Sequence, residues 1–347
     1  MTRPRTWLPT PGASLPQRFR LKTRYILLQA GLLGVALTAS AADAQRTAEQ
    51  TAIQNPPPPT ATTTQQADET LSVSGNVAMG AEYNSNLSVT ELESSSGQSD
   101  MAGTVDANAN VSWQPNERLA AEGGYSYSAS RYQDIDTYDL DLHLLFADLS
   151  YDFTALTLGT NYYFADADLG SDSFLALNQY SLYAGKLFGE QWYLRGALNF
   201  TDKDFDTFNG RDADNEGYSV ELYRFFNDGR TSVSGGYTYE EEDTRDLAFL
   251  YAADTLRLRL NHRFSVASRD ARFQLGYRFQ DREYDYITPS IGVPRDDSLQ
   301  VVDARLEMDV AKNLAVIGRV EHGNHESRLP SADFNDNRMS LALRLSF

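Results

Sequence analysis

The chain ends on Met339-Ser340-Leu341-Ala342-Leu343-Arg344-Leu345-Ser346-Phe347, in which large apolar side chains occupy every second position. A period of two over this length predicts a β-strand with one apolar face and one face of small or polar residues. Segments of about ten residues with this alternation, repeated along a chain, are typical of transmembrane β-barrels, in which lipid-facing and lumen-facing residues alternate. The last strand therefore indicates the fold class of the chain.

The same alternation recurs from residue 70 to the end, in about fourteen segments. These predicted strands lie near 70–83, 102–114, 118–132, 138–151, 155–166, 174–188, 192–202, 217–226, 231–241, 253–264, 271–283, 299–310, 314–324 and 337–347. We therefore predict that residues 70–347 form one all-β domain, an up-and-down antiparallel transmembrane barrel of about 14 strands.

The breaks between the predicted strands alternate in length. After the even strands they are tight, at 115–117, 189–191, 227–229 and 311–313; after most odd strands they are long, at 84–101, 203–216, 242–252, 284–298 and 325–336. Outer-membrane barrels combine short periplasmic turns with longer external loops, whereas a soluble sandwich or propeller has no reason to alternate in this way. The pattern predicts a Gram-negative outer membrane, with both termini in the periplasm.

Two segments precede the predicted barrel. Residues 1–44 have a basic start, an apolar run from Tyr25 to Leu37 and small residues that suit cleavage after Ala41 or Ala44, which is typical of a secretory signal peptide. Residues 45–69 are rich in Gln, Thr and Ala and contain four consecutive prolines, so we expect a disordered periplasmic linker.

Composition narrows the function classes. The chain has no cysteine, which excludes disulfide scaffolds. Its formal net charge of −18 argues against nucleic-acid binding. Its 20 Tyr and 17 Phe suit aromatic belts at two membrane interfaces. The expected partners are outer-membrane lipid, lipopolysaccharide and, during biogenesis, the barrel-assembly machinery, for which the outward residues Leu341, Leu343, Leu345 and Phe347 form the predicted assembly signal.

Charged residues gather on the polar face of four predicted strands near the C-terminus. Pairing Phe264 with Ala271 would place Arg263 opposite Arg272, and directly opposed like charges are destabilising unless something negative lies between them. One interpretation is a charge network that braces a wet barrel wall. The other is a basic ladder that faces acids across a lumen and guides charged solutes. The candidate pore-lining residues are Arg257, Arg259, Arg263, Arg272, Arg278, Arg282, Asp303, Arg305, Glu307, Asp309, Arg319 and Glu321.

Two further patterns point to chemistry only weakly. Asp212, Asp214 and Glu216 alternate like the start of a calcium loop, but the twelfth position holds Tyr223 in place of Glu, so we expect an acidic surface loop that bridges divalent cations to lipopolysaccharide. His325 and Ser327 share a face near a strand end, as in an outer-membrane phospholipase, yet no oxyanion feature accompanies them. We therefore expect no enzyme activity, no cofactor and no metal site.

Residues 70–347 resemble the C-terminal barrel of the surface lipoprotein assembly modifiers. The resemblance rests on Tyr83-Asn84-Ser85-Asn86, on Arg211-Asp212-Ala213 and on the closing stretch from Gly323-Asn324-His325 to Phe347. Members of that family carry a periplasmic helical-repeat domain before the barrel, and only the linker stands in that place here. The sequence favours a channel or porin-like transport protein for small polar or charged solutes. Alternatives are a barrel that translocates or assembles an exported protein or polymer, and a closed structural or adhesive barrel.

Overall fold

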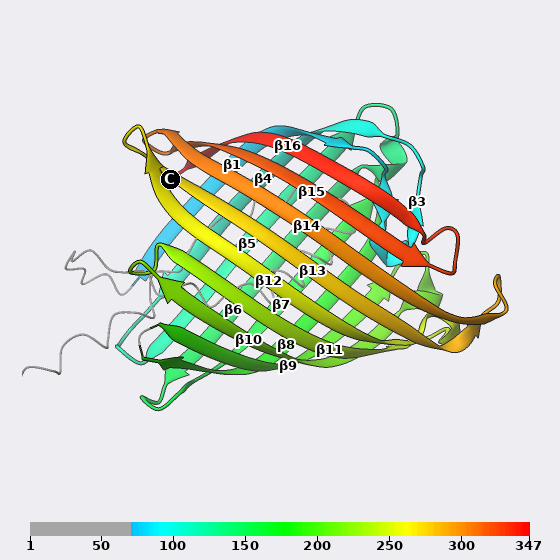
Figure 1. The fold of residues 1–347 in the computed structure, drawn as a ribbon, viewed down its shortest axis with the longest axis horizontal. Helices are drawn as coiled ribbons and strands as arrows, with labels where there is room; N and C mark the ends of the chain where they lie inside the picture. Colours follow the sequence, from blue (N-terminus) through cyan, green and yellow to red (C-terminus); the bar gives the residue numbers. More distant parts are fainter. Residues whose placement is uncertain (1–70, 190) are drawn as a thin grey trace, which may run out of the picture.

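The computed structural model describes residues 71–189 and 191–347, so the predicted signal peptide and linker lie outside the described residues. Within these ranges fourteen strands close into an antiparallel barrel in which each strand pairs with its neighbours along the chain and β1 pairs with β16 (Figure 1). The barrel strands are β1 (Leu71–Asn84), β4 (Asp100–Trp113), β5 (Leu119–Tyr132), β6 (Leu140–Asp152), β7 (Thr157–Leu169), β8 (Asp172–Phe188), β9 (Trp192–Phe205), β10 (Ala213–Phe226), β11 (Thr231–Thr244), β12 (Tyr251–Val266), β13 (Arg269–Thr288), β14 (Val293–Ala311), β15 (Leu314–Ser327) and β16 (Phe334–Ser346). The predicted fold class is confirmed.

Side chains alternate between the two faces of the barrel wall, as the sequence pattern predicts. On β16, Met339, Leu341, Leu343 and Leu345 are exposed on the outer face, and the residues between them face inward. The outer face is apolar on the other strands as well, with Leu198 on β9 and Leu258 on β12 among its exposed residues. Because closure pairs the backbone of every strand on both sides, the wall leaves no sheet edge facing lipid.

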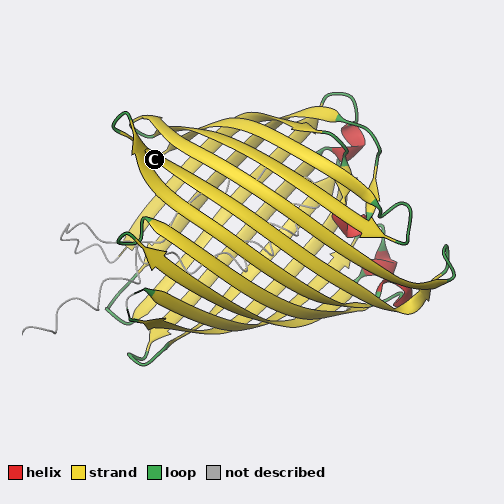
Figure 2. Ribbon diagram, in the orientation of Figure 1, coloured by secondary structure: helices red, strands yellow, loops and turns green. Residues whose placement is uncertain are grey.

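The two ends of the barrel differ. The end where the C-terminus lies, here called the turn end, has short connections such as Asn227-Asp228-Gly229, whose positive φ angles of 52°, 53° and 79° suit a tight hairpin. The opposite end, here called the loop end, carries the short 3-10 helices η1 (Thr90–Leu92), η2 (Asp136–Tyr138), η3 (Asn209–Arg211) and η4 (Leu247–Phe249) (Figure 2). Among the described residues no helix has the length and apolar character needed to cross a bilayer.

The connections at the loop end are shorter than the sequence suggests. The predicted break 284–298 is mostly strand: β13 and β14 pair as far as Thr288 with Val293, beyond a bulge that follows Glu283, and the hairpin projects past the rim (Figure 1). The predicted breaks 203–216, 242–252 and 325–336 shrink likewise to 206–212, 245–250 and 328–333. Hydrogen-bonded ladders continue where the outer face no longer meets hydrocarbon, and there the apolar alternation that marked the strands is no longer required.

The first and last strands close the barrel along a seam. β1 and β16 pair from Asn76 opposite Ser346 to Asn84 opposite Arg338. The last residue extends this ladder, since Gly75 N–H donates to the Phe347 carbonyl and Phe347 N–H donates to the Gly75 carbonyl, each at 2.9 Å. The Phe347 ring lies where a Cβ on residue 75 would be, 2.6 Å from that position, so glycine leaves room for the terminal aromatic ring.

Candidate functional site

One long connection remains at the loop end, and it folds inward. Loop 1 (residues 85–99) joins β1 to β4 and contains η1 between two short paired strands, β2 (Ser88–Val89) and β3 (Ser94–Ser95). Its side chains contact β6 to β9 on one side and β13 and β14 on the other. These strands lie on opposite sides of the β1–β4 pair in the barrel order. Loop 1 begins at the end of β1 and ends at the start of β4, so it must cross the mouth of the barrel to contact both β6 to β9 and β13 with β14.

On one side loop 1 is anchored by apolar packing. Val89 belongs to a buried cluster with Leu140, Leu142 and Leu144 of β6 and Leu177 of β8. These leucines occupy inner-face positions, where a water-filled barrel would carry polar side chains. The apolar patch on the inner wall is thus explained by the loop that covers it.

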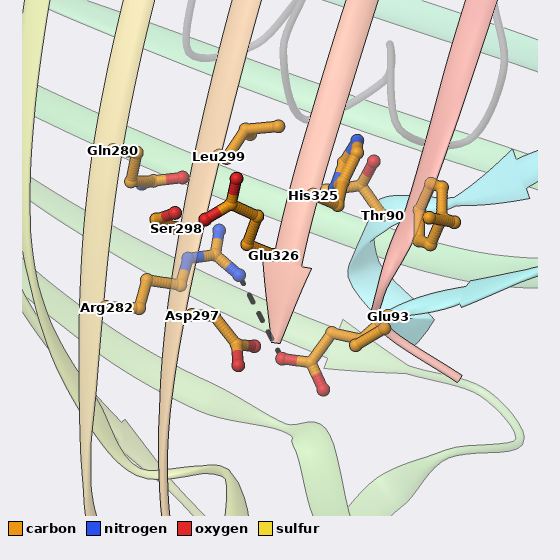
Figure 3. A pocket seen from close by; sticks show the side chains of 11 residues that line it. Thr90, Glu93, Gln280, Arg282, Asp297, Ser298, Leu299, His325 and Glu326 are labelled. Carbon is orange, nitrogen blue, oxygen red and sulfur yellow. Dashed lines mark ion pairs between the residues drawn. The ribbon is translucent and has the colours of Figure 1, made fainter. Parts of the chain in front are cut away.

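On the other side loop 1 is anchored by a buried carboxylate. Glu93 follows η1 in a left-handed backbone conformation, with φ 52° and ψ 46°. Its carboxylate is paired with Arg211 from η3, 3.0 Å away, and with Arg295 of β14, and it accepts a hydrogen bond from the Tyr284 hydroxyl of β13. Arg282 lies 4.0 Å away, and Figure 3 shows it reaching from β13 toward Glu93.

The electrostatics of this anchor favour the charged carboxylate. Burial raises the pKa of Glu93, but the positive charges of Arg211 and Arg295 outweigh it and hold the pKa at about 2. Arg211 also donates to the Glu91 carbonyl at 2.8 Å, and its guanidinium stacks on the Phe249 ring at 3.9 Å. A charge-assisted network therefore ties loop 1 to three elements that are distant in sequence.

Acids and bases continue from this anchor along the inner wall. Lys203 of β9 lies 2.5 Å from Glu242 of β11, and Glu242 accepts a hydrogen bond from the Tyr251 hydroxyl at 2.8 Å. The Arg282 guanidinium stacks over the Tyr251 ring, 4.7 Å from its centroid. The inner wall at the loop end is therefore braced around much of its circumference by paired charges.

A second network braces β14 to β16. Glu307 of β14 accepts from Arg344 of β16 in a two-pronged contact and lies 3.1 Å from Arg305. Arg319 and Glu321 of β15 are 2.6 Å apart. Glu307 is thus held by neighbouring strands of the same wall and does not face the basic ladder from across the lumen.

The candidate pore-lining residues occupy inner-face positions of β12 to β15, and only Asp309, at the turn end of β14, is fully exposed. The register is the predicted one: Phe264 pairs with Ala271, and Arg263 with Arg272. Arg257 likewise stands opposite Arg278. Whether these residues line an open conduit stays a prediction.

The weaker motifs have structural partners. The His325 ring stacks on Phe334 with centroids 4.1 Å apart and lies, like Ser327, on the inner face, so this pair does not meet lipid. Asp212 pairs with Arg245 at 2.7 Å and accepts from the Phe205 N–H at 2.9 Å. Divalent-cation bridging by this loop stays a prediction.

Sequence reasoning missed the site at the barrel mouth. Glu93, Arg295 and Tyr284 all fell in segments predicted to be long external breaks, where charged residues are expected to be solvated. A usable signal is the apolar character of both faces of this strand, with Leu140, Leu142 and Leu144 on one face and Leu145 and Leu149 on the other, because apolar residues on an inner face require a cover.

The comparisons with known proteins concern the fold. No protein-family model matches the sequence, and no curated protein matches it. Similar solved structures include an anion-selective porin from Comamonas acidovorans, with 10% identity, 80% of this chain and 99% of that chain covered and a TM-score of 0.49. OmpT of Vibrio cholerae has 11% identity, with 82% of this chain and 99% of that chain covered and a TM-score of 0.47. CdiB from Acinetobacter baumannii has 11% identity, with 81% of this chain and 61% of that chain covered and a TM-score of 0.44. The resemblance to assembly modifiers is not confirmed.

The closed barrel and its apolar outer face define a transmembrane β-barrel of the outer-membrane type. The lumen, crossed by loop 1 at one end and lined by arginines on β12 and β13, is its candidate functional site.

Proposed function

We propose that the protein is an outer-membrane conduit for small polar or charged solutes, with loop 1 narrowing its mouth. The observation that carries this proposal is the charged inner wall. A barrel that served only as an anchor would have no need of three inner-face arginines on each of β12 and β13, with Arg257 directly opposite Arg278 and Arg263 directly opposite Arg272. Charges of this kind suit a wet lumen, where water and passing ions solvate them.

The orientation follows from the two ends. In barrels of this class the short turns face the periplasm and the longer connections face outward. The loop end, with loop 1 and the projecting β13–β14 hairpin, then meets the medium and lipopolysaccharide, and solutes enter past loop 1.

A closed structural barrel is the second candidate, and the buried ion pairs favour it. Arg295 is 1% exposed and Glu307 is 7% exposed, and paired charges at such burial are typical of a braced wall. In that case loop 1 is a permanent seal.

Single-channel recording on the purified full chain in planar bilayers separates the two. A conduit gives discrete current steps in wild type, which become larger when residues 87–97 are replaced by a short Gly-Ser linker. Heat-denatured protein in the same detergent is the control. Silence from both the wild type and the loop-replaced chain, with each migrating as a folded barrel on unheated gels, would contradict the conduit.

A further inference from the structure

The inner-face arginines fall into two groups by their partners. Arg282, Arg295, Arg305, Arg319 and Arg344 each have a carboxylate within 4.0 Å. Across residues 71–189 and 191–347, none lies within that distance of Arg257, Arg259, Arg263 or Arg272. These four residues are here called the open arginines. They occupy inner positions of β12 and β13, with Asn261 between Arg259 and Arg263.

The open arginines crowd positive charge onto a small area of wall. Arg263 and Arg272 are directly opposed in the β12–β13 ladder, and Arg257 is opposed by Arg278. Inner-face residues of one strand recur at about 7 Å, so Arg257, Arg259 and Arg263 span about 20 Å along the strand. Like charges at these separations repel, and the described carboxylates that attract these arginines, Glu221 and Glu307, do so from beyond 4.0 Å.

The nearest acids are committed elsewhere or offset. Glu307, opposite Arg272, is held by Arg305 and Arg344. Glu221 pairs with Arg195 at 3.7 Å. Asp303 leans over Gly276, the residue opposite Arg259, because its Oδ1 lies 2.2 Å from where a Cβ would be. Because Glu221 and Glu307 are shared with other arginines, these acids offset only part of the positive charge of the four open guanidinium groups.

Arg272 also has unused hydrogen-bond donors. Its Nε and Nη1 atoms are buried and have no partner in the described part of the chain. Each of these N–H groups is able to donate a hydrogen bond to an oxygen of a carboxylate or phosphate.

We propose that Arg257, Arg259, Arg263 and Arg272 form a binding track for small organic oxyanions, carboxylates or phosphates, inside the barrel. This inference rests on the proposed function, because solutes must reach the inner wall. The anion supplies the negative charge that the opposed arginines lack. Sites about 7 to 14 Å apart along β12 let the anion pass from one guanidinium to the next without a single tight site that would trap it.

The test uses the full chain and two probes, citrate and inorganic phosphate. Wild type should be anion-selective by reversal potential in a KCl gradient, and either probe should reduce the chloride current. Changing Arg259→Gln and Arg272→Gln together should reduce the anion selectivity and weaken block by about tenfold per arginine, since each substitution removes a charge-assisted contact. Block by citrate alone would assign the track to carboxylates, and block by phosphate alone to phosphates. The matched control, Arg230→Gln with Lys312→Gln, removes two exposed cations at the turn end and should change neither property.

A second measurement does not need an open pore. Citrate or phosphate should raise the thermal unfolding midpoint of wild type and leave that of the double variant unchanged. The variant should fold well, because it removes repulsion. If the wild type carries no current but is stabilised by the probes, the proposal of a conduit is contradicted and the proposal of an anion-binding track is supported. A conducting wild type with no selectivity, no block and no stabilisation would overturn the track and keep the conduit.

Discussion

Glu93→Gln should release loop 1 from the barrel mouth. The substitution keeps the side chain's shape but removes the charge that Arg211, Arg295 and the Tyr284 hydroxyl surround. Breaking one partner of a buried ion pair costs about 3–5 kcal/mol. Because the Gln oxygen still accepts hydrogen bonds, we take the lower figure of about 3 kcal/mol, which raises the undocked fraction of loop 1 by about a hundredfold.

Thiol labelling measures this fraction directly, since the chain has no cysteine of its own. Val89→Cys places a thiol at a position that is 3% exposed while loop 1 packs against β6 and β8. A small maleimide should react with it about a hundredfold faster in the Glu93→Gln background, because labelling requires undocking. Ser99→Cys, exposed in the same loop, should react equally in both backgrounds. If the thiol introduced by Val89→Cys reacted at the same slow rate with and without Glu93, the carboxylate would not be the anchor and apolar packing would hold the loop.

Three more outcomes are expected. Leu258→Arg, on the outer face of β12, should cost about 2–4 kcal/mol in urea titrations in lipid bilayers, whereas Asn261→Arg, on the inner face, should cost much less; the reverse ranking would invert the strand phase. A protease site inserted in the Asn227–Gly229 turn should be protected in intact cells, and one at Gly292 of the β13–β14 hairpin should be cut. Cleavage of the first site alone would mean that the barrel has the opposite orientation in the membrane. Because the pKa of Glu93 is held at about 2, below its ordinary 4.5, its contribution is complete above pH 4.5 and is lost as pH falls toward 2; the labelling rate of the Val89→Cys variant, relative to that of the Ser99→Cys variant, should therefore stay constant from pH 7 to 5 and rise only in stronger acid.

The strands could be predicted from the sequence because their signal is local. Leu341, Leu343 and Leu345 reveal their face within a few residues, and the tight turn after β12 fixes the register that opposes Arg263 to Arg272. A period of two survives any small error in strand ends. The inner-face position of these arginines is therefore predictable from the sequence.

Loop 1 could not be predicted in this way because its conformation depends on contacts between residues that are far apart in the sequence. Glu93 finds Arg295 and Tyr284 about two hundred positions later in the chain, and no local pattern encodes that encounter. The β13–β14 hairpin was misread for a different reason. Outside the hydrocarbon its strands carry Asp285, Pro294 and Asp296 in place of alternating apolar residues, so composition indicated a loop where the ladder continues.

The seam between β1 and β16 joins two strands that are far apart in the sequence. The ladder that closes the barrel joins β1 to β16, from Asn76 opposite Ser346 to Asn84 opposite Arg338, so closure needs both of these strands. Until then β1 and the most recently made strand present unpaired edges, which invite association with other chains. Joining the two ends of so long a chain is also the most non-local step of folding, and non-local pairing is slow. The polypeptide must therefore be kept from aggregating until β1 and β16 have paired. Loss of Phe347, which removes its two hydrogen bonds to Gly75, should lengthen that period.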